Sequence, residues 1–196
     1  MHLYLDTTHG IQLGLLNNQY DWIEINNLGE LKSSAVIHAY INDLLVKYNQ
    51  EILDISSLVY CAGPGSYTGM RVSEGIAQIF EMAQIKLYSF YHFEIPQIYG
   101  NQHGKWLDHA FKGEIFIYDW NENKSSKSRI PLSDLILNND CPVFSFDDNF
   151  LDKKVSSTYS LIMENPSTLL KNILTEPTSR RELYYYRELS EEFRRG

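Results

Sequence analysis

CAGPGSYTGMRVSEG, residues 61–75, places four glycines and a proline between an apolar run and a segment with helical apolar spacing. The preceding run, SLVYCA at residues 57–62, predicts a buried strand, and residues 70–84 predict a helix. A glycine-rich connection from a strand to a helix has two common uses. Its backbone amides bind a phosphate, or its glycines only permit a tight turn. The function of the chain depends on which use applies.

The glycine spacing matches neither of the two common phosphate-binding motifs. A Walker loop needs four residues between its glycines and then Gly-Lys-Ser/Thr, whereas five residues separate Gly63 from Gly69, and Met70-Arg71 follows. Gly63, Gly65 and Gly69 give G-x-G-x-x-x-G, which is one residue longer than the dinucleotide fingerprint. The residues therefore favour a structural turn, and they leave open an anion site built from backbone amides alone.

The segments around this connection predict an antiparallel meander followed by a β-α-β-α-β run. Strands are expected at residues 1–7, 11–16, 20–25, 57–62 and 86–90. A helix capped by Ser33 or Ser34 is expected to end near Asn49, because residues 37, 40, 41, 44, 45 and 48 form one apolar stripe. Further on, the pattern predicts strands at 106–110, 114–120 and 142–146, an exposed polar loop at 121–128, and a helix from Asn165-Pro166.

The helix after the glycine segment carries two stripes of different character. One is apolar and is expected to pack on the sheet: Val72, Ile76, Ile79 and Phe80. The other has a small residue at every fourth position: Gly69, Ser73 and Ala77. A small-residue stripe either packs on the same sheet or lets a partner helix approach closely. Under the second interpretation, Ala77→Arg gives a folded protein that no longer pairs, whereas failure to fold would indicate internal packing.

The composition limits the classes of function. The chain has 196 residues, 43% of them hydrophobic, and a net charge of −8 from 17 basic and 25 acidic residues. The apolar content suffices for a packed core, and the acidic balance argues against a large nucleic-acid footprint. Cys61 and Cys141 form no spacing motif, the six histidines lack zinc-site spacing, and no run is apolar enough to cross a membrane. We therefore expect a cytoplasmic protein without a disulfide framework or a metal.

Three segments, taken in order, resemble the TsaB family, which is also called YeaZ. Asp6-Thr7-Thr8 resembles the family's DTS, and INDLL at residues 41–45 resembles its LIDELL. GPGSYTG at residues 63–69 resembles GPGSFTG, and MRV at residues 70–72 resembles the LRI that follows it. The first half of the chain follows the family pattern in order, whereas the second half diverges from it and is short.

The resemblance implies an α/β fold of two lobes, related to the actin-like and Hsp70-like (ASKHA) ATPases with their RNase H-like lobes. It implies a first lobe at residues 1–95 with partner-binding helices, and a reduced second lobe at residues 96–196. The implied role is that of a non-catalytic subunit, which pairs with a TsaD-type transferase and supports threonylcarbamoyl transfer to adenosine 37 of tRNA. A TsaE-type ATPase and tRNA are implied partners within that complex. A homodimer is implied when the partner is absent.

Two groups of candidate site residues follow. A partner interface is expected at Ile37, Tyr40, Ile41, Leu44, Gly69, Met70, Arg71, Ser73, Glu74 and Ala77. A nucleotide site would use Asp6, Thr7, Thr8, Gly63, Gly65 and Ser66, with ATP and Mg at a subunit interface as the candidate cofactor. Catalytic residues are not expected. Two alternatives stay open: an independent actin-like ATPase or kinase that binds phosphates through Asp6 and the glycine segment, and a homodimeric interaction protein with a different role.

Overall fold

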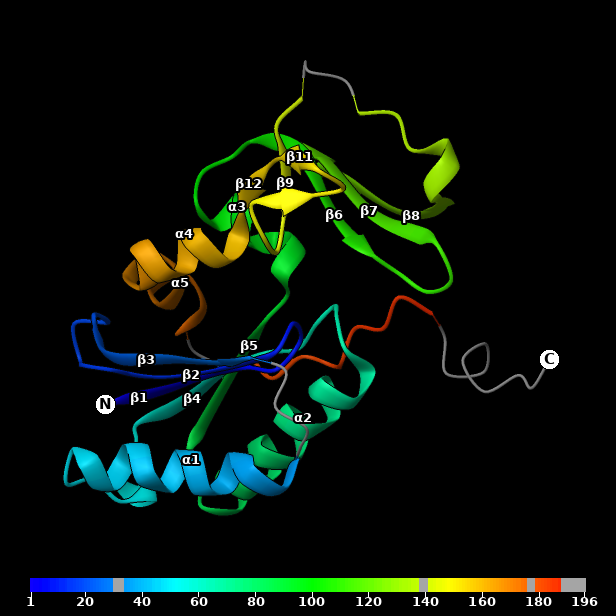
Figure 1. Cartoon of the computed structure of the whole chain (residues 1–196). Helices are drawn as coiled ribbons and strands as arrows, with labels where there is room; N and C mark the ends of the chain where they lie inside the picture. Colours follow the sequence, from blue (N-terminus) through cyan, green and yellow to red (C-terminus); the bar gives the residue numbers. More distant parts are fainter. Residues whose placement is uncertain (30–33, 138–140, 176–178, 188–196) are drawn as a thin grey trace. The chain divides into compact units, whose positions relative to one another are not determined.

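The protein is described from a computed structural model of the chain, shown in Figure 1. The structure describes residues 1–29, 34–137, 141–175 and 179–187. The chain divides into two compact units: unit 1 is Met1–Tyr91 with Leu170–Tyr184, and unit 2 is His92–Leu169 with Tyr185–Gly196. The predicted boundary at residue 95 therefore lies slightly beyond the first segment of unit 1. The predicted second lobe also included residues 170–184, which belong to unit 1.

Unit 1 is built on a five-stranded sheet with the strand order β3-β2-β1-β4-β5. The first three strands pair antiparallel, and β4 pairs parallel with both β1 and β5. Helices α1 and α2 lie on the same side of this sheet (Figure 1). The predicted meander and β-α-β-α-β order are therefore confirmed. The bounds are β1 His2–Asp6, β2 Ile11–Leu16, β3 Trp22–Gly29, α1 Ser34–Lys47, η1 Ile52–Asp54, β4 Ser57–Cys61, α2 Tyr67–Met82 and β5 Lys86–Phe90.

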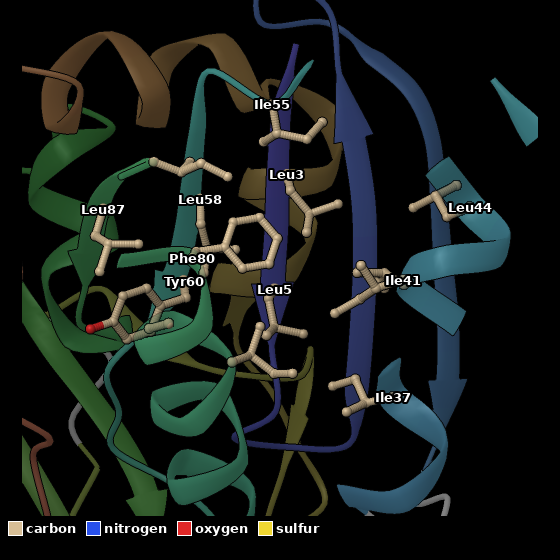
Figure 2. Packing of buried hydrophobic residues seen from close by; sticks show 14 of the residues in the cluster. Leu3, Leu5, Ile37, Ile41, Leu44, Ile55, Leu58, Tyr60, Phe80 and Leu87 are labelled. Atoms are coloured by element: carbon tan, nitrogen blue, oxygen red, sulfur yellow. The ribbon is translucent and has the colours of Figure 1, made fainter. Parts of the chain in front are cut away.

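The main core of unit 1 lies between one face of the sheet and the two helices (Figure 2). Alternation along β1 places Leu3 and Leu5 on this face, since successive side chains of a strand point to opposite sides. Each fully buried leucine or isoleucine contributes about 1.5–3 kcal/mol, so this cluster is a main source of stability. Figure 2 labels ten of its members: Leu3, Leu5, Ile37, Ile41, Leu44, Ile55, Leu58, Tyr60, Phe80 and Leu87.

The opposite face of β1 carries His2, which predicts a pH dependence of stability. Its Nδ1 lies 2.8 Å from Ser57 Oγ, and burial lowers the pKa of His2 from 6.5 to about 4. The unfolded chain therefore takes up this proton at a higher pH than the folded chain. As a result, the free energy of unfolding falls as the pH drops from about 6.5 to about 4.

We expect His2→Gln to remove this contribution and to flatten the acid side of the stability profile. Urea unfolding of the wild type and the variant, near pH 7 and near pH 5, measures the difference. The wild type is expected to lose more stability than the variant between the two conditions. Equal losses would contradict the prediction.

Unit 2 is built on a second five-stranded sheet with the strand order β12-β9-β6-β7-β8. Strands β6, β7 and β8 form an antiparallel meander, and β9 and β12 extend it with parallel pairings. The bounds are η2 His92–Glu94, α3 Ile95–Ile98, β6 His103–His109, β7 Glu114–Asn121, β8 Lys124–Pro131, η3 Leu132–Asp134, β9 Val143–Ser145, β10 Asn149–Phe150, β11 Lys153–Lys154, β12 Ser156–Ser157 and α4 Thr158–Glu164, followed by α5 Pro166–Ile173. Among the described residues, no helix has both the length and the apolar character needed to cross a membrane.

Two local predictions differ from the structure. Residues 121–128, predicted as a polar loop, mostly belong to β8, an exposed edge strand that pairs with β7 along its length. Such a strand lacks the apolar alternation by which strands are recognised, and lysine is common on sheet edges. Helix α2 begins at Tyr67, before the predicted start at residue 70, because Ser66 caps it. Ser33, one of two predicted caps for α1, lies outside the described residues.

Candidate functional site

The glycine segment is a strand-to-helix turn held against the hairpin between β1 and β2. Residues 62–66 connect β4 to α2, and Ser66 Oγ accepts a hydrogen bond from the Gly69 amide at 3.2 Å. This bond caps the helix, because it satisfies one of the amides that have no partner within the first turn. The Ser66 amide itself donates to the Thr8 carbonyl oxygen at 2.8 Å. The connection is thus fixed by its own cap and by the hairpin.

The glycines permit the hairpin backbone to lie directly against this turn. A Cβ atom on Gly69 would overlap the Thr7 carbonyl oxygen, and one on Gly65 would lie 2.5 Å from Thr8 Cβ. Gly63 has a φ of +118°, a conformation that disfavours any side chain. The protein's own backbone therefore occupies the space beside two of the glycines. This packing supports the structural interpretation of the motif.

The polar side chains of the hairpin bind neighbouring groups of unit 1. Asp6 is fully buried, and its Oδ1 accepts hydrogen bonds from the Thr8 amide at 2.8 Å and from Thr8 Oγ1 at 2.6 Å. Thr7 Oγ1 donates to the Gly69 carbonyl oxygen at 2.6 Å and lies 2.5 Å from Ser73 Oγ. These bonds satisfy buried polar groups and stabilise the contact between the hairpin and α2. The candidate nucleotide residues thus lie together, and nucleotide binding by them stays a prediction.

Most of the candidate interface residues face the core of unit 1. Ser73 and Ala77 have no exposed surface, and Gly69 packs against the Thr7 carbonyl group. In place of the expected approach by a partner helix, the small-residue stripe lets α2 approach its own sheet and hairpin. Four apolar candidates are at most 6% exposed: Ile37, Ile41, Leu44 and Met70. Of these four, Ile41 also lines a cavity between α1 and α2, and the role of all four in a partner interface stays a prediction.

Two of the candidates do reach the surface. Tyr40 on α1 is 36% exposed. Arg71 on α2 is exposed, and its guanidinium carbon lies 4.7 Å from the centroid of the Tyr67 ring. A guanidinium over an aromatic ring is attracted by the negative face of the ring, so this contact restricts the Arg71 side chain. Both residues remain available to a partner of α1 and α2.

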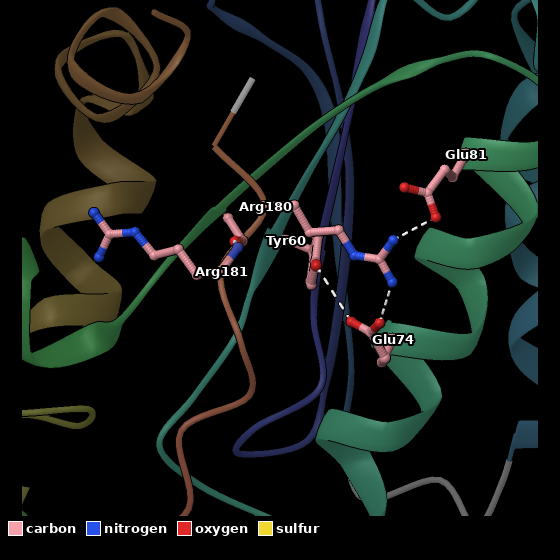
Figure 3. A network of polar contacts seen from close by, with 6 residues as sticks. Tyr60, Glu74, Glu81, Arg180 and Arg181 are labelled. Carbon is pink, nitrogen blue, oxygen red and sulfur yellow. Dashed lines mark hydrogen bonds and ion pairs between the residues drawn. The ribbon is translucent and has the colours of Figure 1, made fainter. Parts of the chain in front are cut away.

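Glu74 belongs to a polar network on the flank of α2 (Figure 3). Its carboxylate accepts hydrogen bonds from the Arg180 guanidinium and, at 3.3 Å, from the Tyr60 hydroxyl. Burial raises the pKa of Tyr60 to about 12, so the phenol stays protonated and able to donate. Arg180 also binds Glu81. The structure therefore places Glu74 in an internal network of unit 1 that the sequence did not indicate.

An apolar groove between α1 and α2 is the feature that sequence reasoning missed. Two adjoining cavities of about 420 and 490 Å³ are both lined by His38, Ile76 and Ile79. Ile79 is 43% exposed, and Val46 on α1 is 62% exposed. The other lining residues are Ile41, Asn42, Leu45, Gln50, Glu51, Ile52, Tyr67, Thr68, Arg71, Val72, Gly75 and Phe80. This α1–α2 groove is the candidate functional site, because exposed apolar surface of this kind is typical of protein-binding sites.

Two residues of the groove were visible in the sequence, and for one of them, Ile79, the predicted contact was wrong. Val72 and Ile79 were expected to pack on the sheet with Ile76 and Phe80. The buried positions of α2 are Met70, Ser73, Ile76, Ala77 and Phe80, so Ile76 and Phe80 lie as predicted. Val72 is partly buried and packs against the core cluster as predicted, whereas Ile79 is 43% exposed, and both residues line the groove. Helix α2 has more apolar residues than one of its faces can bury. This excess is the signal in the sequence by which the second surface could have been found.

The two sheets, with the helices that connect their strands, define an α/β protein built of two compact units. Its fold is YeaZ-like. The chain is similar to YeaZ from Pseudomonas aeruginosa with a TM-score of 0.58 and 15% identity, over 85% of this chain and 92% of that one. It is also similar to an uncharacterized protein described by its similarity to peptidase YeaZ from Pseudomonas aeruginosa, with a TM-score of 0.61 and 14% identity, over 93% and 98% of the two chains. No known family profile matches the chain, and no curated protein matches its sequence. The predicted fold class is confirmed.

Proposed function

We propose that this chain is a non-catalytic subunit that pairs with a TsaD-type transferase and supports threonylcarbamoyl transfer to adenosine 37 of tRNA. The observation that carries the proposal is the apolar α1–α2 groove on a YeaZ-like fold. The sequence resemblance attributes partner binding to these same two helices. The exposed Ile79 on α2 and Val46 on α1 supply apolar contact area on both walls of such an interface.

The arrangement of the glycine segment supports a scaffolding role over an independent ATPase. A phosphate site needs backbone amides and side chains that point at the ligand. Here the Ser66 amide, Thr7 and Asp6 are engaged within unit 1. In the proposed complex, ATP with Mg binds at the interface between this chain and its partner. The TsaE-type ATPase and tRNA join only when that partner is present. Without that partner, the exposed groove favours a homodimer.

A titration against the TsaD-type protein of the same cell tests the proposal. We expect a one-to-one complex by calorimetry and size exclusion, and the purified chain alone is expected not to hydrolyse Mg-ATP. Deletion of the gene is expected to reduce threonylcarbamoyladenosine in tRNAs that read ANN codons, measured by mass spectrometry of tRNA nucleosides.

Each alternative gives a different result in these measurements. Brisk Mg-ATP turnover by the chain alone, lost in Asp6→Ala, would favour an independent ATPase. A stable homodimer with unchanged tRNA modification after gene deletion would favour an interaction protein with another role. A folded chain that fails to bind the transferase overturns the proposal.

A further inference from the structure

Residues 179–184 form a segment, here named the C-terminal strap, that lies along the edge strand of the unit 1 sheet. The Ser89 amide on β5 donates a hydrogen bond to the Ser179 carbonyl oxygen at 2.9 Å. Further along, the Tyr184 amide donates to the Ala62 carbonyl oxygen, at the end of β4, at 2.8 Å. The strap is thus attached at both of its ends by backbone hydrogen bonds, although about ninety residues separate it from β5 in the sequence.

From this strap, Arg180 extends to α2 and binds two of its carboxylates (Figure 3). One guanidinium nitrogen donates to Glu74 and the other donates to Glu81. The Arg180 side chain is 29% exposed and that of Glu74 is 23% exposed, so this contact is shielded more than an ordinary surface ion pair. Figure 3 shows the Arg181 side chain pointing the opposite way, and its guanidinium carbon lies 5.1 Å from the centroid of the Tyr91 ring.

The contact between the strap and α2 is not continuous. A cavity of about 440 Å³ lies along them, lined by Glu74, Arg180, Arg181, Glu182 and Leu183. The two segments therefore do not pack side by side throughout. Arg180 bridges them, and a guanidinium suits this role because its rigid fork presents several donors at once.

Helical geometry places this bridge and the apolar groove residues Val72 and Ile79 on different sides of α2. Glu74 and Glu81 are seven residues apart, so they lie on one face, two turns from each other. At about 100° per residue, Val72 and Ile79 lie about 140–160° around the helix from Glu74. The strap therefore holds the flank of α2 that is roughly opposite Val72 and Ile79, which are apolar residues of the wall that α2 contributes to the groove.

We propose that Arg180 is a positioning residue for α2, and that the strap thereby sets the affinity of the α1–α2 groove for its partner. This inference rests on the proposed function for the identity of that partner. With Arg180 removed, two carboxylates remain on one face of α2 without their cation. Helix α2 then loses its charged contact with the strap, and the groove is held less firmly in one shape. When only a fraction of the molecules have the groove in its binding-competent shape, the partner binds more weakly than it does when all of them have it.

Arg180→Ala and Arg181→Ala form a matched pair for the test, since they remove the same side chain from neighbouring strap positions. Each variant is titrated against the TsaD-type protein, and amide hydrogen exchange is measured in the free protein. We expect Arg180→Ala to bind about fivefold more weakly or worse, in the range of ordinary coupling energies, and to exchange faster in α2. Arg181→Ala is expected to behave like the wild type in both measurements.

Further variants separate positioning from a general loss of stability. Glu81→Gln is expected to have a smaller effect, and Arg180→Ala with Glu81→Gln to be no worse than Arg180→Ala alone, because both act through one contact. Arg180→Lys keeps the charge without the fork and is expected to restore binding only in part. Should Arg180→Ala not fold, Arg180→Lys carries the same comparison with Arg181→Ala.

Wild-type affinity and wild-type α2 exchange in the Arg180 variant would overturn the inference, and so would an equal effect of Arg181→Ala. If the wild type does not bind the transferase, the proposed function fails. The exchange measurement then still decides the positioning role: unchanged α2 exchange in Arg180→Ala overturns it, and faster exchange confined to α2 supports it.

Discussion

Replacing Ala77 with arginine is expected to prevent unit 1 from folding. Ala77 has no exposed surface and belongs to the core cluster between α2 and the sheet. An arginine there would place a long charged side chain where a methyl group now fits, and burying an unpaired charge is among the most costly substitutions. We expect a loss of more than about 4 kcal/mol, a large part of the roughly 5–15 kcal/mol by which such proteins are stable.

Gln78→Arg is the matched control, because residue 78 is the exposed neighbour on the same helix. This variant is expected to fold with an unfolding midpoint close to that of the wild type. Circular dichroism and thermal unfolding of the two variants make the comparison. A folded Ala77→Arg protein with normal stability that no longer pairs would instead place the small-residue stripe at the partner interface, as the sequence alone suggested.

The two faces of α2 show where sequence reasoning reaches its limit. Apolar spacing predicts the inner face of a helix when bulky side chains fill the space against the sheet. On α2, part of that space is filled by the hairpin backbone at Thr7, so Gly69 and Ser73 are turned inward, while Ile79 is half exposed. The decisive contact joins residues about sixty positions apart, and no local pattern in α2 encodes it.

The helices and strands that could be predicted are those whose own residues carry the full apolar pattern of that type of element. Strands β1, β2, β4 and β5 and helix α1 each carry enough apolar residues to specify their own type and order. The glycine segment was likewise interpretable, because its spacing lacked the lysine and register of known phosphate motifs. In contrast, β8 and the C-terminal strap are polar, and they take their conformation from strands to which they bind. The residues of β8 and of the strap do not themselves indicate which strands they bind, so their conformations could not be predicted from their own sequences.

Substitution of Ile79 by glutamate is expected to weaken pairing strongly in a protein that still folds. Ile79 lines both cavities of the α1–α2 groove and is 43% exposed, so a carboxylate at this position can reach water in the free protein. In a complex, the partner would cover that carboxylate among apolar groups without a cation. A buried unpaired charge at the centre of an interface typically costs about 2 kcal/mol or more, which is roughly a thirtyfold loss of affinity.

Met82→Glu provides the control for this experiment, since Met82 lies on the same helix, is 86% exposed and lines neither cavity. It adds the same charge three residues further along, so a long-range electrostatic effect would appear in both variants. We expect calorimetric titration against the transferase to show near-normal binding for Met82→Glu and binding weaker by about thirtyfold or more for Ile79→Glu, with similar unfolding midpoints. Normal pairing of Ile79→Glu would mean that the partner docks elsewhere on the chain. Equal weakening by both variants would mean that the charge of this helix end, rather than the apolar groove, governs association.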